Sequence, residues 1–120
     1  MNKYKKGKQG EDIACKYLLD NGYLIVERNY RGKRGEVDII ARDGNVIVFI
    51  EVKSWKTIPF AEAEFSIGAM KKRRIVKSAE QYIFENNKQI SGLDIRFDFV
   101  FIDVLKNSIT HSKNIIMEGC

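Results

Sequence analysis

Two apolar segments of the sequence carry charged side chains in their interiors. Asp38 lies inside the segment 36–42, and Glu51 and Lys53 end the segment 48–53. Burying a carboxylate or an ammonium group without a partner costs several kcal/mol, so a metal ion, a substrate or an opposite charge is expected to compensate them. Two carboxylates and a lysine together resemble a magnesium-dependent phosphodiesterase site.

The chemistry of phosphodiester hydrolysis gives these residues definite roles. The reaction needs a nucleophilic water and stabilisation of the charge that develops on the phosphate, and a divalent cation held by carboxylates can share both tasks. We expect Asp38 and Glu51 to hold Mg²⁺ or Mn²⁺, with the carbonyl oxygen of Val52 within reach. Lys53 would stabilise the phosphate or help to position and deprotonate the water. Glu11 would complete the ligand set or hold a water on the metal.

A first helix is predicted over residues 10–21, because apolar residues recur there at helical spacing and Asn21-Gly22 is a left-handed stop signal. Glu11 precedes Ala14 by three positions and Leu18 by seven, so it lies on the inward stripe of this helix. An acid placed there points toward the sheet.

The sheet is predicted to begin with strands over 23–30 and 36–42, followed by a hairpin at Asp43-Gly44. A two-residue turn there sets Asp38 opposite Phe49 and diagonal to Glu51 on one face. Lys53 shares that face through the period of two. A loop longer by one residue would shift the register and separate the charges.

The second half of the chain is predicted to contain a loop over 55–64 and a helix from 66 to about 87 that Ser66 caps. A strand over 95–104 follows, and residues 108–116 add an edge strand. The expected fold is therefore a single α/β domain over residues 1–120, with a central mixed sheet of about five strands flanked by helices in the order α-β-β-β-α-β-β.

Basic residues gather in three segments, 3–8, 28–34 and 71–77, although the formal net charge is only +5. Cations in the first half of a helix repel one another and oppose the helix dipole, which favours an anionic partner. A solvated helix face is the alternative reading. The candidate nucleic-acid-binding residues are Arg31, Lys33, Arg34, Lys71, Lys72, Arg73 and Arg74.

Several other classes of protein are not expected. No apolar run approaches the roughly 20 residues of a membrane helix, and the basic start lacks an apolar signal core. Cys15 and Cys120 have no zinc-site spacing, so a reduced cytoplasmic setting fits best. His111 is the only histidine, so no His-rich metal site can be built, and we expect it to be incidental. No phosphate-binding loop with the required Gly-Lys-Ser/Thr spacing is present.

Short motifs spread along the chain form a recognisable set: Gly10-Glu11, Gly22-Tyr23, Glu27-Arg28-Asn29-Tyr30, Gly35-Glu36-Val37-Asp38-Ile39-Ile40, Phe49-Ile50-Glu51-Val52-Lys53, Lys71 to Arg74 and Arg96-Phe97-Asp98. With these motifs the chain resembles the YraN family of bacterial proteins, and the resemblance covers nearly the whole domain. Departures from the family pattern are Trp55, where arginine is frequent, and Ala61, where glycine is usual. Val37 replaces the proline that names the wider nuclease superfamily described next.

The YraN family is similar to the PD-(D/E)XK nuclease superfamily, particularly the archaeal Holliday-junction resolvases. That likeness implies a restriction-endonuclease-like fold and catalysis with a divalent metal. It assigns the helix acid to Glu11, the metal aspartate to Asp38, the second metal acid to Glu51 and the catalytic lysine to Lys53.

Three hypotheses follow. The first is a metal-dependent DNA endonuclease acting on branched or damaged DNA, for which a two-fold homodimer would present paired sites. The second is a non-catalytic nucleic-acid-binding module on a nuclease fold. The third is a structural or interaction protein in which the acids and the lysine pair with one another.

Overall fold

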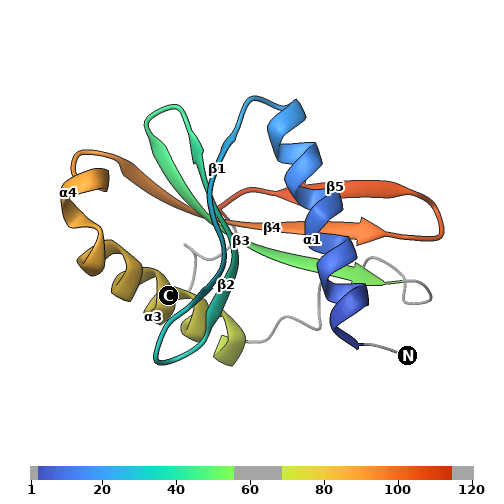
Figure 1. Ribbon diagram of the computed structural model, residues 1–120, viewed down its shortest axis with the longest axis horizontal. Coiled ribbons are helices and arrows are strands. Elements are labelled where there is room, and N and C mark those ends of the chain that lie inside the picture. Colours follow the sequence, from blue (N-terminus) through green and yellow to red (C-terminus); the bar gives the residue numbers. More distant parts are fainter. Residues whose placement is uncertain (1–2, 56–68, 115–120) are drawn as a thin grey trace.

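The computed structural model of the protein is an α/β fold (Figure 1). It describes residues 3–55 and 69–114, with side chains at 9–54 and 72–114. The elements are α1 (Lys3–Asp20), β1 (Leu24–Arg31), β2 (Glu36–Asp43), β3 (Val46–Trp55), α3 (Ala69–Glu85), α4 (Asn87–Ile90), β4 (Asp94–Asp103) and β5 (Ser108–Ser112). The expected order α-β-β-β-α-β-β is confirmed, with the single turn of α4 as an addition.

The five strands form one mixed sheet in the order β1-β2-β3-β4-β5. Neighbours pair antiparallel except β3 and β4, which run parallel in register from Val46↔Asp94 to Trp55↔Asp103. A parallel pair needs a long crossover, and the chain that makes it carries α3. As predicted, the hairpin with the charged residues is central and the last strand lies at an edge.

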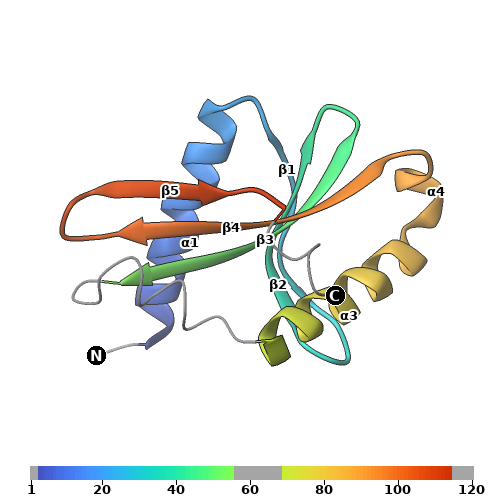
Figure 2. The same ribbon diagram turned by 180° about the vertical axis from the view of Figure 1, so that it is seen from behind.

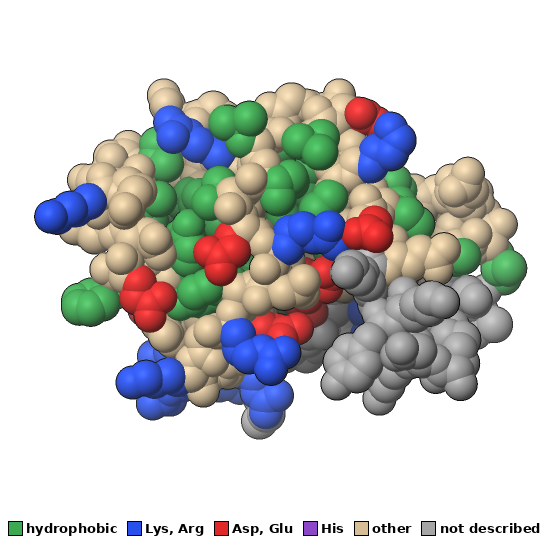
Figure 3. Space-filling view, viewed as in Figure 1, with side chains coloured by type: hydrophobic (Ala, Val, Ile, Leu, Met, Phe, Trp, Pro, Cys, Tyr) green, Lys and Arg blue, Asp and Glu red, His purple; other side chains and the backbone are tan. Residues whose placement is uncertain are grey.

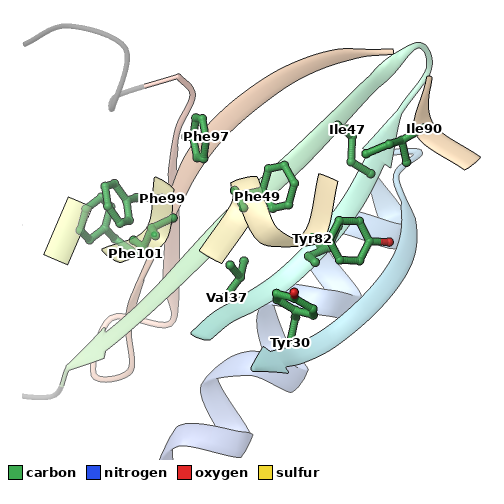
Figure 4. Packing of buried hydrophobic residues seen from close by; sticks show 12 residues of the cluster. Tyr30, Val37, Ile47, Phe49, Tyr82, Ile90, Phe97, Phe99 and Phe101 are labelled. Carbon is green, nitrogen blue, oxygen red and sulfur yellow. The ribbon is translucent and has the colours of Figure 1, made fainter. Parts of the chain in front are cut away.

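The two faces of the sheet are covered by different helices (Figures 1 and 2). Alternation along β3 sends Val48 and Ile50 into the cluster with α1, which includes Ala14 and Leu18. Phe49, between them, belongs to the cluster with α3 (Figure 4). The α3 cluster contains Tyr30, Val37, Ile40, Ile47, Phe49, Ile75, Ala79, Tyr82, Ile90, Phe97, Phe99 and Phe101. Each face is therefore a separate apolar layer, and β3 is buried by both.

Helix α1 begins at Lys3, well before the predicted residue 10, and it ends where the sequence indicates. Gly22 has a φ of +87°, the left-handed conformation that glycine adopts without steric penalty. The amide of Tyr23 donates to the carbonyl of Leu18 at 3.0 Å, and the amide of Gly22 donates to that of Leu19 at 3.1 Å. These two bonds form the Schellman stop that turns the chain into β1.

The hairpin between β2 and β3 corrects the predicted register. Asp43 pairs with Val46 and Ile40 pairs with Phe49, so Gly44 and Asn45 form the turn and Asp38 does not lie opposite Phe49. The carboxylate of Asp43 lies 3.3 Å from the guanidinium of Arg96. Gly44, with a φ of +60°, opens the turn in its place. Because the shift is two residues, the side chains of β3 keep their predicted faces.

Helix α3 buries Ile75, Ala79 and Tyr82, as its predicted apolar stripe requires. Ser66, the predicted cap, and the predicted loop 55–64 apart from Trp55 fall outside the described residues. None of the helices in the described ranges is long and apolar enough to cross a membrane.

Candidate active site

Asp38 lies at the point where β2 and β3 separate. Pairing of the two strands ends at Ile39↔Ile50. Val37 packs in the α3 layer and Ile39 in the α1 layer, so the alternation of β2 is interrupted at Asp38. Beyond the last pair, the carboxylate of Asp38 accepts a hydrogen bond of 2.8 Å from the amide of Val52. The aspartate thereby provides an acceptor for a strand amide and fixes its own position against β3.

Glu51 and Lys53 flank Val52 on β3. Val52 packs in the α1 layer, so its two neighbours face the α3 side of the sheet, where their partners on β4 are Phe99 and Phe101. Glu51 is only 6% exposed, and Lys53 is half-buried. The structure thus places the amide that holds Asp38 directly between the two predicted charged residues.

Glu11 reaches the same region from α1. Gly10 brings the helix close to β3, because a Cβ at this position would lie 3.0 Å from Oγ of Ser54. Burial raises the pKa of the Glu11 carboxyl, and the negative charge of Asp38 raises it further. Hydrogen bonds from Asn29 and Arg28 lower the pKa without cancelling these effects. The charge of Asp38 therefore acts on Glu11 across the space between α1 and β2.

Arg28 and Asn29 belong to this region, although the predicted site did not include them. Arg28 lies 2.7 Å from Asp12 and 3.6 Å from Glu11. Asn29 has a φ of +55°, a left-handed conformation inside a strand, and bonds to Glu11. Strained backbone of this kind is concentrated at functional sites. The signal in the sequence was the Glu27-Arg28-Asn29-Tyr30 segment of the family resemblance.

A divalent cation fits part of this arrangement. The donors are carboxylate and carbonyl oxygens, and Mg²⁺ is usually held by one or two carboxylates with several waters. The side chains at 9–54 and 72–114 contain no group of three or more His, Cys, Asp or Glu residues that could hold a metal ion. Glu36, two residues before Asp38, is exposed and pairs with Arg31 at 3.3 Å.

The predicted basic residues are partly brought together. Lys33, Arg34, Arg73 and Arg74 line a hollow of about 480 Å³, together with Lys77, which was not among the predicted binding residues. Arg31 pairs with Glu36 on the strand. Blue side chains gather over the β1–β2 turn and α3 at the lower left of Figure 3. The side chain of Lys71 lies outside the described residues.

A second polar cluster contains His111. The sequence suggested that this residue is incidental, but both of its ring nitrogens have hydrogen-bond partners. Its Nε2 lies 2.7 Å from Oδ2 of Asp98, and its Nδ1 lies 3.0 Å from the hydroxyl of Tyr17. Asp98 also accepts hydrogen bonds from the guanidinium of Arg96 at 3.0 Å and from the amide of Asn114 at 3.0 Å. No spacing in the sequence predicts this cluster, since its members come from α1, β4, β5 and the segment after β5.

The described structure defines the class of the protein. A five-stranded mixed sheet lies between α1 and α3 in the order α-β-β-β-α-β-β, which is a restriction-endonuclease-like α/β arrangement. The model of the uncharacterised protein family UPF0102 matches residues 10–102, which include all four predicted site residues. The chain belongs to this family, and the resemblance to the YraN proteins is confirmed.

Relatives in several bacteria are similar over almost their whole length. A UPF0102 protein of Persephonella marina is 44% identical, over 91% of this chain and 90% of the relative. One of Sulfurihydrogenibium is 49% identical over 95% and 96%, and one of Clostridioides difficile is 41% identical over 95% and 98%. Among solved structures, Pyrococcus furiosus SfsA in complex with Ca²⁺ has a TM-score of 0.29 and 15% identity. The match covers 93% of this chain and 64% of SfsA, and a likeness this low carries no argument.

Proposed function

We propose that this protein is a divalent-metal-dependent endonuclease that hydrolyses phosphodiester bonds in DNA, with branched or damaged DNA as its substrate. One observation carries the proposal: the Asp38 carboxylate is held on the amide of Val52, between the buried Glu51 and the half-buried Lys53. Carboxylates and a lysine fixed on rigid strands suit a reaction that depends on positioning and charge stabilisation.

Each residue has a role that its position supports. Asp38, the carbonyl of Val52 and one further acid, Glu51 or Glu11, would hold Mg²⁺ or Mn²⁺. The cation would supply positive charge against the negative charge that develops on the phosphate. Lys53 would bind the phosphate or orient the attacking water. Arg28 and Asn29 hold the Glu11 carboxylate in place.

The test is cleavage of labelled linear, single-stranded, flap and four-way-junction DNA with Mg²⁺, Mn²⁺ or a chelator. The diagnostic variant is Asp38→Asn, and the matched control is Asp94→Asn, an exposed aspartate at the opposite end of the β3–β4 pair. We expect cleavage that requires metal, is lost in Asp38→Asn and persists in Asp94→Asn. If purified protein cuts none of these structures, the endonuclease proposal fails.

A non-catalytic nucleic-acid-binding protein is the second candidate. It is favoured by the absence of a three-donor metal group among the described side chains and by the cation-lined hollow. It predicts binding that is sensitive to salt and needs no metal. Binding by wild type and Asp38→Asn alike, without cleavage, would select it.

The proposal includes a homodimer, because a four-way junction offers two equivalent strands to a two-fold pair of sites. Light scattering with and without junction DNA measures the mass directly. If the protein is a monomer in both conditions, the homodimer proposal fails, but the proposed endonuclease reaction does not depend on it.

A further inference from the structure

The basic hollow, defined by Lys33, Arg34, Arg73, Arg74 and Lys77, is a preformed feature of about 480 Å³ between the β1–β2 loop and α3. The five side chains that line it are all cationic. Two segments about 40 residues apart in sequence supply them. The fold therefore brings together cations from two separate segments of the chain.

Close contacts fix the loop on the helix. The amide of Lys33 donates to Oε1 of Gln81 at 2.8 Å, and the amide of Gly32 donates to the carbonyl of Gly35 at 2.8 Å. A Cβ on Gly35, whose φ is +155°, would lie 3.3 Å from Oγ of Ser78 and 3.4 Å from Cβ of Arg74. A side chain at this φ would be strained and would crowd both atoms, so glycine favours the close approach of the loop to α3.

The hollow gathers five positively charged side chains, and such a concentration of one sign of charge attracts an anion. Arg73 and Arg74 lie four and three residues before Lys77 on α3, and like charges at these separations repel one another. Two acids lie near these cations: Glu80 is 3.7 Å from Lys77, and hydrogen bonds, together with the charge of Lys33, lower the pKa of the Glu85 carboxyl. Lys77 and Glu80 are both well exposed, so that pair offsets little of the repulsion. Arginine forks match phosphate oxygens in pairs, and lysines add point charges.

We propose that the basic hollow binds internal backbone phosphates of the nucleic-acid strand that enters the site at Asp38. This inference rests on the proposed function and adds a second contact point for the same strand. Arg34 precedes Asp38 by four residues, and a strand rises ~3.3 Å per residue, so the two backbones are at most about 13 Å apart. The bound phosphates therefore lie within a few nucleotides of the phosphate to be cut.

The first experiment measures binding without metal, so it does not depend on cleavage. Fluorescence anisotropy with a labelled oligonucleotide compares wild type with Lys33→Glu/Arg73→Glu and with the control Lys106→Glu/Lys113→Glu, which changes two exposed lysines beyond β4. We expect at least a tenfold loss of affinity in the hollow variant and a slope of log K against log salt reduced by about 1 to 2, at ~0.7–0.9 per phosphate. Equal losses in the two variants would overturn the proposal.

A second experiment locates the contact on the strand. Neutral methylphosphonate linkages are placed one at a time along the oligonucleotide. One or two adjacent internal positions should weaken binding by wild type severalfold and have no effect in the hollow variant, because the partner charges are already gone. A uniform effect at all positions, or an effect confined to a terminal phosphate, would overturn an internal-phosphate site.

The two proposals fail separately. Cleavage by wild type with an unchanged salt slope in the hollow variant would refute the hollow and leave the endonuclease standing. Position-specific binding in a protein that never cuts DNA would refute the endonuclease and support the hollow.

Discussion

The protein holds acids beside arginines in two regions, and their charges are balanced differently. At the first region, Asp98 is bound by Arg96, His111 and the amide of Asn114. Burial pushes the pKa of the Asp98 carboxyl upward, but the hydrogen bonds from His111, Arg96 and Asn114 outweigh it and lower the pKa. At the second, Glu11 has Arg28 and Asn29, yet burial and Asp38 leave the pKa of its carboxyl raised.

The pKa of the Asp98 carboxyl is lowered, whereas that of the Glu11 carboxyl is raised. The protein therefore stabilises the charged form of Asp98 but not that of Glu11. The Asp98 cluster satisfies its acid within the protein, and this is what a polar group that fixes strand positions requires. In the Glu11–Asp38 region the charge of Asp38 acts against that of Glu11, and acids with pKa values raised by burial and a like charge are concentrated at functional sites. A cation bound there would remove the repulsion. Substitutions in the two regions should therefore affect different properties: stability at Asp98 and activity at Asp38.

The largest expected effect is on catalysis in the Asp38 region. Asp38→Asn should lower the cleavage rate at least a thousandfold, which is about 4 kcal/mol of transition-state stabilisation. The free energy of unfolding should change by less than about 1 kcal/mol, because the amide oxygen of asparagine can still accept from Val52. Single-turnover cleavage and urea denaturation measure the two quantities. If Asp38→Asn keeps full activity but loses much of its stability, Asp38 has a structural role like that of Asp98.

The next effect is on stability in the Asp98 region. Asp98→Asn should lower the free energy of unfolding by about 3 kcal/mol, because it leaves the charge of Arg96 without its main partner. The loss falls at the low end of the usual range because Arg96 keeps Asp43 at 3.3 Å and the hydroxyl of Tyr23 at 2.8 Å. Urea denaturation at pH 7 measures it. If Asp98→Asn leaves the free energy of unfolding unchanged, the cluster has no structural role.

The pH dependence of the same cluster follows from the lowered pKa of Asp98. An acid whose pKa is lower in the folded than in the unfolded protein contributes stability above the unfolded pKa, which is 3.8 for Asp98. That contribution is lost as the pH falls through the folded pKa. Wild type should therefore lose stability more steeply than Asp98→Asn below about pH 4. Thermal melting at pH 7 and pH 3 compares them, and parallel profiles would contradict the assignment.

A smaller effect is expected from metal. Ion bound to the folded state stabilises it by about 2.7 kcal/mol at a concentration of 100 times its Kd. Mg²⁺ or Mn²⁺ should thus raise the melting temperature of wild type and of Asp94→Asn, but not that of Asp38→Asn. An equal rise in all three proteins would indicate non-specific ion binding and would remove the contrast between the regions.

The sequence predicted these two regions unequally, for a physical reason. Glu11, Asp38, Glu51 and Lys53 interrupt apolar periodic segments, so their types and spacing are visible in one dimension. The hairpin register was wrong by two residues because Asp43-Gly44 and Gly44-Asn45 are both acceptable two-residue turns, and the local sequence does not choose between them. His111 and Asp98 meet only through tertiary packing across the β4–β5 hairpin, which no local pattern encodes.

The smallest expected effect tests the raised pKa of Glu11. A carboxyl with a raised folded pKa contributes stability below its unfolded value of 4.5 and loses it as pH rises through the folded value. Glu11→Gln should therefore melt slightly higher than wild type at pH 7, by ~1–3 °C given solvent screening of a partly exposed site, and the difference should shrink below pH 4. Asp12→Asn, a change in the adjacent exposed acid that Arg28 binds, should give no gain.

Metal should reverse the advantage of Glu11→Gln. A cation near Asp38 relieves the repulsion that raises the pKa of Glu11, so wild type should gain more melting temperature from Mg²⁺ than the variant does. Differential scanning fluorimetry at pH 7 with and without Mg²⁺ compares the two proteins against Asp12→Asn. If Glu11→Gln is less stable than wild type at pH 7 without metal, then Arg28 and Asn29 satisfy Glu11 as fully as Asp98 is satisfied, and both regions are structural.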